Sequence, residues 1–151
     1  MNKKIFLAIA LISVFLVTVA CSAVNAQKPD VVPPANKDIT ITNADDFTQN
    51  AHMQKQLDVA KGSSIVITLI SNATTGFSWN ENAVIADSSI LQQTIHRQIS
   101  ADSDKLGAAG SEQWTIKALK TGQTTIHLEY SRPWEGGEKA VWTLDVAVTI
   151  K

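Results

Sequence analysis

Three short segments of this sequence carry the side chains best suited to recognising another molecule: residues 72–77, 107–110 and 132–134. The third segment sets Arg132 and Trp134 on either side of a proline, and two glycines follow closely. Trp and Arg are enriched among the residues that dominate binding energy at protein interfaces, and a large aromatic ring at a turn is difficult to bury. These residue types predict recognition of a protein surface.

The first segment reads Asn-Ala-Thr-Thr-Gly-Phe and joins two strand-like stretches. A purely structural interpretation is open, because Gly76 can supply a positive φ and Asn72 can close a turn through its side chain. The functional interpretation starts from the same closed, compact turn. Thr74 and Thr75 are stiff at χ1 and carry hydroxyl groups able to bond across an interface. A slim, rigid loop of this kind, which ends at Phe77, can enter a narrow cleft.

The second segment lies in a polar stretch, residues 101–111, between two strand-like stretches. One interpretation is a flexible surface loop. The other is that Gly107 and Gly110 let the backbone approach a partner where a Cβ atom would collide. Leu106 would then add an apolar contact.

The third segment combines a restricted backbone with its aromatic side chain. Pro133 fixes φ and so reduces the ordering cost of binding. Arg132 can pair with a partner or brace its own loop. Trp134 can stand exposed as an interface hot spot, or it can fold back as a lid over the end of the fold.

Motifs for catalysis, metal binding or cofactor binding do not accompany these segments. The three histidines are isolated in the sequence, at His52, His96 and His127. Their spacing does not suit a metal site, and we expect the last two to be solvated on strand faces. Three carboxylates near the second segment are also expected to be solvated: Asp102, Asp104 and Glu112. The sequence holds no nucleophile elbow, phosphate loop or dinucleotide fingerprint. We therefore expect a protein that is not an enzyme and needs no metal or cofactor.

Strand-like alternation surrounds the three segments and must position them. Apolar and polar residues alternate with a period of two, which buries one face of a strand, in residues 38–42, 77–79, 91–99, 114–119, 126–130 and 142–150. Residues 64–71 are also strand-like, with apolar side chains on both faces, which favours a central strand. In residues 91–99 the pattern places Leu91, Ile95 and Ile99 on one side and His96 on the other. Weak helical patterns remain in residues 44–50 and 80–88.

Several short strands without a long helix predict an all-β, immunoglobulin-like antiparallel β-sandwich. Trp79, Trp114 and Trp142 supply bulk between its sheets, and no disulfide can staple it because its only candidate cysteine precedes the domain. Alternate connections of a sandwich emerge at the same end, so the three segments are expected to form one edge. The net charge of −1 gives no reason to expect nucleic acid as a partner.

The N-terminus predicts export. Two lysines precede an apolar run over residues 5–20, which is shorter than the roughly 20 residues of a membrane-spanning helix. Residues 18–21 resemble a bacterial lipobox that would make Cys21 a lipidated first residue, although Thr18 stands where an aliphatic residue is usual. Alternatively, cleavage after Ala26 would give a periplasmic or secreted protein. We expect an export signal in residues 1–20, a proline-containing tether in 21–36, and a binding domain in 37–151.

Together, the three segments resemble the binding loops of the chagasin family, β-sandwich inhibitors of papain-like cysteine proteases. The resemblance implies that Thr74, Thr75 and Gly76 cover the catalytic cysteine and histidine of the protease. It implies that Trp134 packs on an aromatic surface on the primed side of the cleft. The chain departs from the family at Ala73, where the pattern has proline, and its second segment is less rich in glycine.

The resemblance implies a reversible, tight-binding inhibitor that occludes the cleft of a papain-family cysteine protease with three loops. We expect it to act as a monomer, without covalent chemistry, and to contact a membrane only through a lipid on Cys21 in the cell envelope. Two alternatives remain open at this point. The domain could be a non-inhibitory immunoglobulin-like binding module, or it could be a structural envelope lipoprotein.

Overall fold

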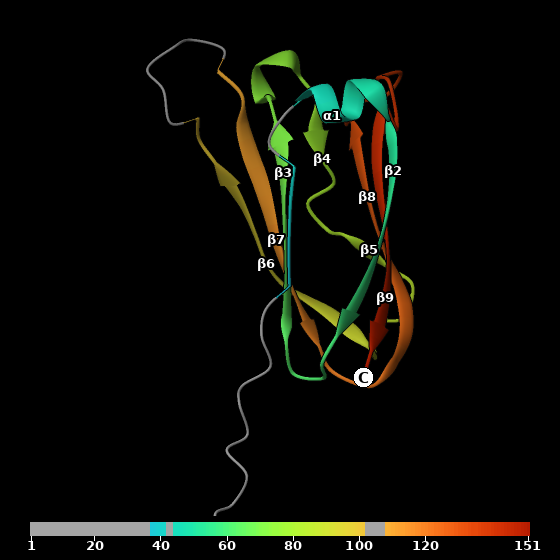
Figure 1. Ribbon diagram of the computed structural model, residues 1–151. Helices are drawn as coiled ribbons and strands as arrows, with labels where there is room; N and C mark the ends of the chain where they lie inside the picture. Colours follow the sequence, from blue (N-terminus) through green and yellow to red (C-terminus); the bar gives the residue numbers. More distant parts are fainter. Residues whose placement is uncertain (1–36, 42–43, 102–107) are drawn as a thin grey trace, which may run out of the picture. The chain divides into compact units, whose positions relative to one another are not determined.

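The computed structural model describes residues 37–41, 44–101 and 108–151, and most of these residues lie in two β-sheets (Figure 1). The first sheet has the strand order β1-β3-β7-β6, and the second has the order β2-β9-β8-β4, with β5 also paired to β8. The strands are β1 Lys37–Ile41, β2 His52–Val59, β3 Ser64–Ser71, β4 Ser78–Trp79, β5 Val84–Ile85, β6 Leu91–Ile99, β7 Gly110–Ala118, β8 Gly122–Ser131 and β9 Trp142–Ile150. The helical elements are α1 Ala44–Gln49 and the 3₁₀ turn η1 Ala73–Thr75.

The core lies between the two sheets and follows the predicted alternation. In β9 the inward residues Leu144 and Val146 are fully buried, and in β3 so are Ile65, Ile67 and Leu69. The two sheets meet through aromatic rings as well, because Trp79 of one sheet lies edge-on to Trp114 of the other, with 6.4 Å between ring centroids. The predicted β-sandwich is confirmed. Within the described residues, no helix is long and apolar enough to span a membrane.

Most strand pairs are antiparallel, as predicted, but two pairs are parallel. Strand β1 runs alongside β3 in the same direction, and β2 runs alongside β9 in the same direction. Helix α1, which matches the predicted helical pattern in residues 44–50, lies between these two outer strands in the chain. The second weak helical pattern, in residues 80–88, is wrong, because that stretch contains the short strand β5.

A β-bulge in β6 overturns the predicted faces of that strand. The register of β6 on β7 shifts between Gln93 and Ile95. One extra residue moves every later side chain to the opposite face. Leu91 is therefore buried while Ile95 is 52% exposed. His96 faces inward and packs against Trp114, with 5.0 Å between ring centroids, so the prediction of a solvated histidine is wrong.

Candidate functional site

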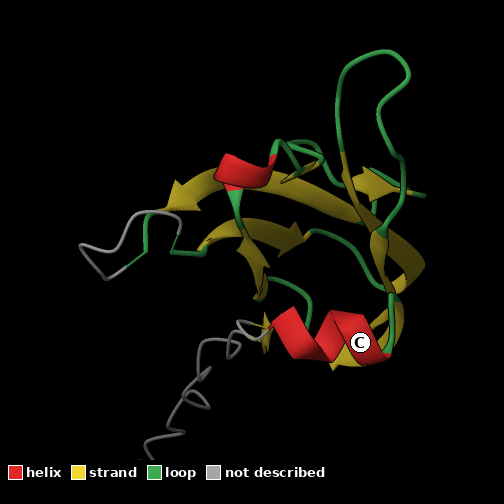
Figure 2. Ribbon diagram, turned by 90° about the horizontal axis from the view of Figure 1, so that it is seen from above, coloured by secondary structure: helices red, strands yellow, loops and turns green. Residues whose placement is uncertain are grey.

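The strands bring the described parts of all three segments to one end of the sandwich. Ser71 at the end of β3 pairs with Gly110 at the start of β7, and Tyr130 near the end of β8 pairs with Trp142 at the start of β9. Figure 2 looks down on this end, with η1 near the long connection between β8 and β9. We call this end of the fold the loop edge, meaning residues 72–77, 108–110 and 132–138.

Residues 72–77 form a compact turn held by its own hydrogen bonds. The Asn72 side-chain oxygen accepts from the Thr74 amide at 3.2 Å and from the Thr74 hydroxyl at 2.6 Å. The Thr75 hydroxyl donates to the Asn72 carbonyl at 2.6 Å. Gly76 ends the turn with φ +78°, a left-handed conformation that favours glycine. Both threonine hydroxyls therefore donate within the loop, so they keep only acceptor capacity for a partner.

The base of this turn is attached to the second sheet through Tyr130. The Tyr130 hydroxyl accepts a hydrogen bond from the Asn72 amide at 3.0 Å, and its ring stacks on Phe77 at 5.5 Å. Tyr130 also stacks on Trp142 at 4.8 Å, and Trp142 stacks on Phe47 of α1 at 5.0 Å. Because Tyr130 and Phe47 are buried, this row of rings connects the exposed turn to the core.

Residues 132–138 close on themselves in a second loop. The Arg132 amide donates to the Glu138 carbonyl at 2.8 Å, and the Gly137 amide donates to the Trp134 carbonyl at 3.1 Å. An ion pair joins Arg132 Nη1 to Glu138 Oε2 at 3.1 Å. Lys139 Nζ adds a hydrogen bond to the Trp134 carbonyl at 3.2 Å. The structure thus shows Arg132 bracing its own loop, one of the two roles that the sequence left open.

The two loops also touch each other. The guanidinium carbon of Arg132 lies 4.4 Å from the centre of the Phe77 ring and 5.8 Å from that of Trp134, within range of cation–π attraction. The Trp134 indole covers Gly76, where a Cβ atom would come within 2.7 Å of the ring. The positive φ at position 76 therefore favours glycine, and a side chain there would also have to displace the Trp134 ring.

Trp134 remains 51% exposed although it rests on Gly76. It does not belong to the buried core: one side of the ring covers Gly76, and the rest of the ring stays exposed. Its outer half is available to a partner, and its neighbours Gly76 and Arg132 are fixed by hydrogen bonds within their own loops. This is the environment in which an aromatic side chain contributes most to an interface.

The second segment is described only in part. Leu106 and Gly107 lie outside the described residues, as do Asp102, Asp104 and, at the N-terminus, Cys21 and the predicted export signal and tether. Gly110 is described, and a Cβ atom there would lie 2.3 Å from the Ile99 carbonyl oxygen. Gly110 is therefore needed for close packing of β6 on β7. Its approach to a partner stays a prediction.

One residue of this end was missed by the sequence analysis. Glu112 is 1% exposed, so the expectation of a solvated carboxylate is wrong. Its Oε1 atom accepts from the Ser71 hydroxyl at 2.7 Å and from the Trp79 amide at 3.1 Å, and His96 Nε2 lies 3.0 Å from Oε2. The signal was present in the sequence, because Glu112 alternates in phase with Trp114, which is buried.

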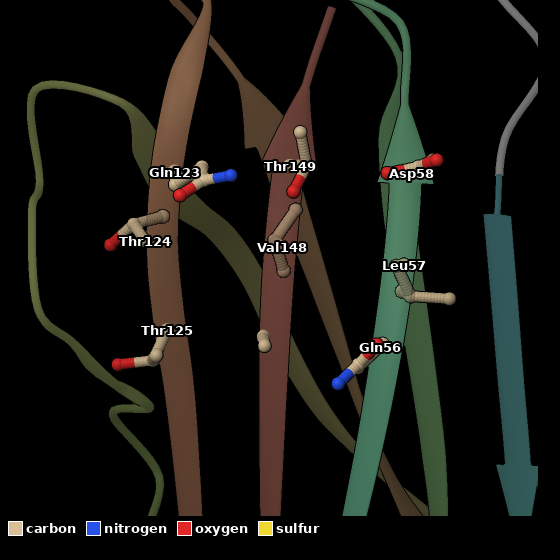
Figure 3. Close-up of a pocket in the computed structure, with 9 residues that line it drawn as sticks. Gln56, Leu57, Asp58, Gln123, Thr124, Thr125, Val148 and Thr149 are labelled. Atoms are coloured by element: carbon tan, nitrogen blue, oxygen red, sulfur yellow. The ribbon is translucent and has the colours of Figure 1, made fainter.

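A separate hollow of about 700 Å³ lies on the outer face of the second sheet (Figure 3). Its lining is mostly polar and includes Gln56 and Asp58 of β2, Gln123 of β8 and Thr149 of β9. Asp58 and Gln123 both pair with Thr149, close to the ends of β2 and β9 and the start of β8. The hollow therefore lies at the opposite end of the sandwich from the loop edge. Within the described ranges, no three metal-ligating side chains gather at a common point.

A rigid sandwich that projects mutually braced loops from one end defines a binding protein that acts through its loops. Residues 58–148 match the family described as Chagasin family peptidase inhibitor I42. This match spans more than half of the chain, and the protein belongs to the chagasin family. The family consists of protease inhibitors and not of enzymes.

Individual relatives agree with this assignment. Amoebiasin-2 of Entamoeba histolytica is 35% identical over 95 residues, which are 63% of this chain and 76% of that protein. Chagasin of Trypanosoma cruzi is 34% identical over 88 residues, which are 57% of this chain and 80% of that protein. The crystal structure of the cysteine protease inhibitor EhICP2 from Entamoeba histolytica matches with a TM-score of 0.61 and 25% identity, covering 78% of this chain and 96% of that chain. PbICP-C, solved in complex with falcipain-2, has a TM-score of 0.52 at 18% identity over 78% of this chain and 99% of that chain, which shows the shared fold.

Proposed function

We propose that this protein is a reversible inhibitor of papain-family cysteine proteases, which blocks the active-site cleft with its loop edge. The observation that carries the proposal is the mutual bracing of residues 72–77 and 132–138 in a member of the chagasin family. Loops that are ordered before binding lose little entropy on association. Together with the second segment, which the sequence predicts as a third contact, these loops can supply the roughly 800 Å² per partner that a stable protein complex buries.

The closed turn in residues 72–77 supports inhibition without cleavage. The Thr75 amide donates to the Asn72 carbonyl and the Gly76 amide donates to the Ala73 carbonyl, both at 3.1 Å. These bonds keep the backbone tightly turned, whereas a peptide in a protease cleft must be extended to expose its scissile bond. Thr74, Thr75 and Gly76 would cover the catalytic cysteine and histidine, while Trp134 would pack on the primed side of the cleft. The inhibitor would dissociate intact.

Export and a lipid anchor on Cys21 are also part of the proposal. The topology supports this arrangement, because Lys37 pairs with Ile65 at the start of β3, whereas the turn at residues 72–77 follows the end of β3. The tether would therefore join the domain at the end opposite the loop edge. Eight residues of strand span about 26 Å. A protein anchored in this way would present its loops to the solvent. We propose that it acts as a monomer.

The direct test is a titration of papain with the purified domain, residues 37–151, using a fluorogenic peptide substrate. We expect stoichiometric loss of activity that is reversed on dilution, with the inhibitor intact by mass spectrometry. A folded domain that leaves papain and a panel of related cysteine proteases fully active would contradict the proposal and favour a non-inhibitory binding module. Mass spectrometry of the mature N-terminus from a bacterial host tests the anchor separately. A diacylglyceryl mass on Cys21 supports it, and an unmodified start at Gln27 excludes it.

A further inference from the structure

We propose that Glu112 is the positioning residue of the loop edge: a buried carboxylate that fixes both ends of the turn at residues 72–77 in the shape that enters a protease. This inference rests on the proposed function and names the residue on which the geometry of the turn at residues 72–77 depends. Glu112 belongs to none of the three segments. It lies in β7, two residues after Gly110.

The burial of Glu112 calls for a physical reason. A carboxylate is rarely removed from water unless it is paired and hydrogen-bonded, because its desolvation is costly. Glu112 is 1% exposed and shares its face of β7 with Trp114 and Ile116, both fully buried. An apolar residue at this position would pack there without that cost. The carboxylate must therefore be doing something that packing does not require.

The partners of Glu112 show what it holds. Ser71, which donates to Oε1 at 2.7 Å, is the residue immediately before the turn. Trp79, whose amide donates to the same oxygen at 3.1 Å, lies two residues after Phe77. One oxygen atom thus receives a donor from each end of the segment. Ser71 is in the first sheet and Trp79 is in the second, so the contact also ties the two sheets together beneath the loop edge.

The other carboxylate oxygen fixes the direction of the Glu112 side chain. His96 Nε2 lies 3.0 Å from Oε2, and the His96 side chain is itself only 14% exposed. Its ring packs on Trp114, which limits its own rotation. Hydrogen bonds to a charged acceptor are shorter and stronger than neutral ones. A carboxylate held on one side by His96 can therefore impose a fixed spacing on Ser71 and Trp79.

A second hydrogen bond of the same region strengthens this assignment. The Trp79 ring nitrogen donates to the Ile70 carbonyl at 2.8 Å, so β4 is tied directly to the end of β3 beside the Glu112 contact. The two bonds together make the base of the turn a closed frame across the sheets. Loss of the Glu112 acceptor would leave the Ser71 hydroxyl and the Trp79 amide buried without partners, which favours rearrangement of the base.

The chain offers a matched pair of substitutions to test this role. Ser71 is the last residue of β3 and Ser63 is the residue before its start; both are buried, and each donates through its hydroxyl group. Ser71 donates to Glu112 beside the loop edge, whereas Ser63 donates to the Ala60 carbonyl at the far end. Ser71→Ala and Ser63→Ala therefore each remove one donating hydroxyl group from a buried position. Only the first should alter binding.

We expect Ser71→Ala to weaken inhibition of papain roughly tenfold, the effect of losing one hydrogen bond to a charged group, and Ser63→Ala to leave it within about twofold. Glu112→Leu should weaken it more than Ser71→Ala. Glu112→Gln keeps an acceptor oxygen and should restore most of the affinity. Equal inhibition constants for the two serine variants, or no recovery with glutamine, would overturn the assignment.

Amide hydrogen exchange of the free protein provides a readout that does not depend on any protease. In Ser71→Ala, faster exchange should be confined to peptides covering residues 70–79, whereas Ser63→Ala should leave those peptides unchanged. A uniform rise in exchange would show a purely structural role and overturn the inference. If the wild-type domain fails to inhibit papain, the proposed function fails, but this comparison still decides whether Glu112 positions the turn.

Discussion

Replacing Trp134 with alanine would remove half-exposed aromatic surface from the loop edge without opening the core. Trp134 is 51% exposed, and its inner half rests on Gly76. A tryptophan side chain can bury roughly 150–250 Å², so roughly half of that area, about 75–125 Å², is available to a partner. At about 25 cal/mol per Å² this corresponds to about 2–3 kcal/mol of binding free energy, or about 30- to 200-fold in Kd.

The stability of the free protein should change much less. The contacts that Trp134 makes, with Gly76 and the Arg132 guanidinium at 5.8 Å, lie at the surface. Their loss should cost about 1 kcal/mol or less. The assay is the inhibition constant for papain beside the thermal midpoint Tm of each variant. Leu119→Ala is the matched control, because Leu119 is 40% exposed and follows the end of β7, away from the loop edge.

Two results would refute this reasoning. If Trp134→Ala inhibits papain as well as the wild type does, the exposed half of the ring does not contact the protease. If its Tm falls as far as a core truncation would lower it, by the equivalent of about 3–5 kcal/mol, Trp134 supports the fold and its burial has been misjudged. Trp134→Phe, which retains a ring over Gly76, should lie between the wild type and alanine in affinity.

Three further substitutions test the geometry of the turn at residues 72–77. Gly76→Ala places a side chain at φ +78° and within 2.7 Å of the Trp134 ring, so we expect a loss of about 1–2 kcal/mol in stability and weaker inhibition, measured by urea unfolding and papain titration. Ala73→Pro occupies the first position of η1, where proline is tolerated and Asn72 already has an extended φ of −127°, and it should strengthen inhibition by about 0.4–1 kcal/mol. Tyr130→Phe removes the hydroxyl that accepts from the Asn72 amide at 3.0 Å and should cost about 1 kcal/mol, with faster exchange of that amide; unchanged exchange would show that the bond does not hold the turn.

The sequence predicted correctly those strands in which apolar residues recur with a period of two on a face that is buried in the core. Strand β9 alternates apolar and polar residues over its whole length, and its predicted bounds are the observed ones. The predicted bounds of β3 are also the observed ones, although its apolar residues lie on both faces. Strand β2 was missed because its buried positions, Met53 and Val59, are separated by a mainly polar and charged stretch. Its place in the sheet depends on pairing with β9, which local pattern cannot supply.

In the candidate site too, local features were predicted from the sequence, whereas contacts between distant segments were not. Arg132, Trp134 and Gly76 stand out by residue type, so the sequence located the two described loops. It could not show that the loops pack on each other, because the contact of Trp134 with Gly76 joins residues far apart in the chain. For Glu112 the period of two, extended back from Trp114, indicates the buried face, but the predicted strand began at Trp114 and Glu112 was expected to be solvated. A charged residue that alternates in phase with a buried tryptophan indicates that the charged side chain is itself buried and is hydrogen-bonded in the interior.

The row of rings formed by Phe77, Tyr130, Trp142 and Phe47 explains how a domain without a disulfide can hold the turn at residues 72–77. Each aromatic pair adds roughly 0.5–1.5 kcal/mol beyond area burial, and the row runs from the exposed turn to a ring of α1 that is fully buried. The turn at residues 72–77 is therefore attached directly to the core at that end. It follows that substitutions in this row, such as Trp142→Leu, should weaken inhibition more than their cost in stability predicts, because Trp142 is partly buried and packs against the core. Equally destabilising substitutions at the far end, such as Val148→Ala, should leave the affinity of the folded molecules unchanged.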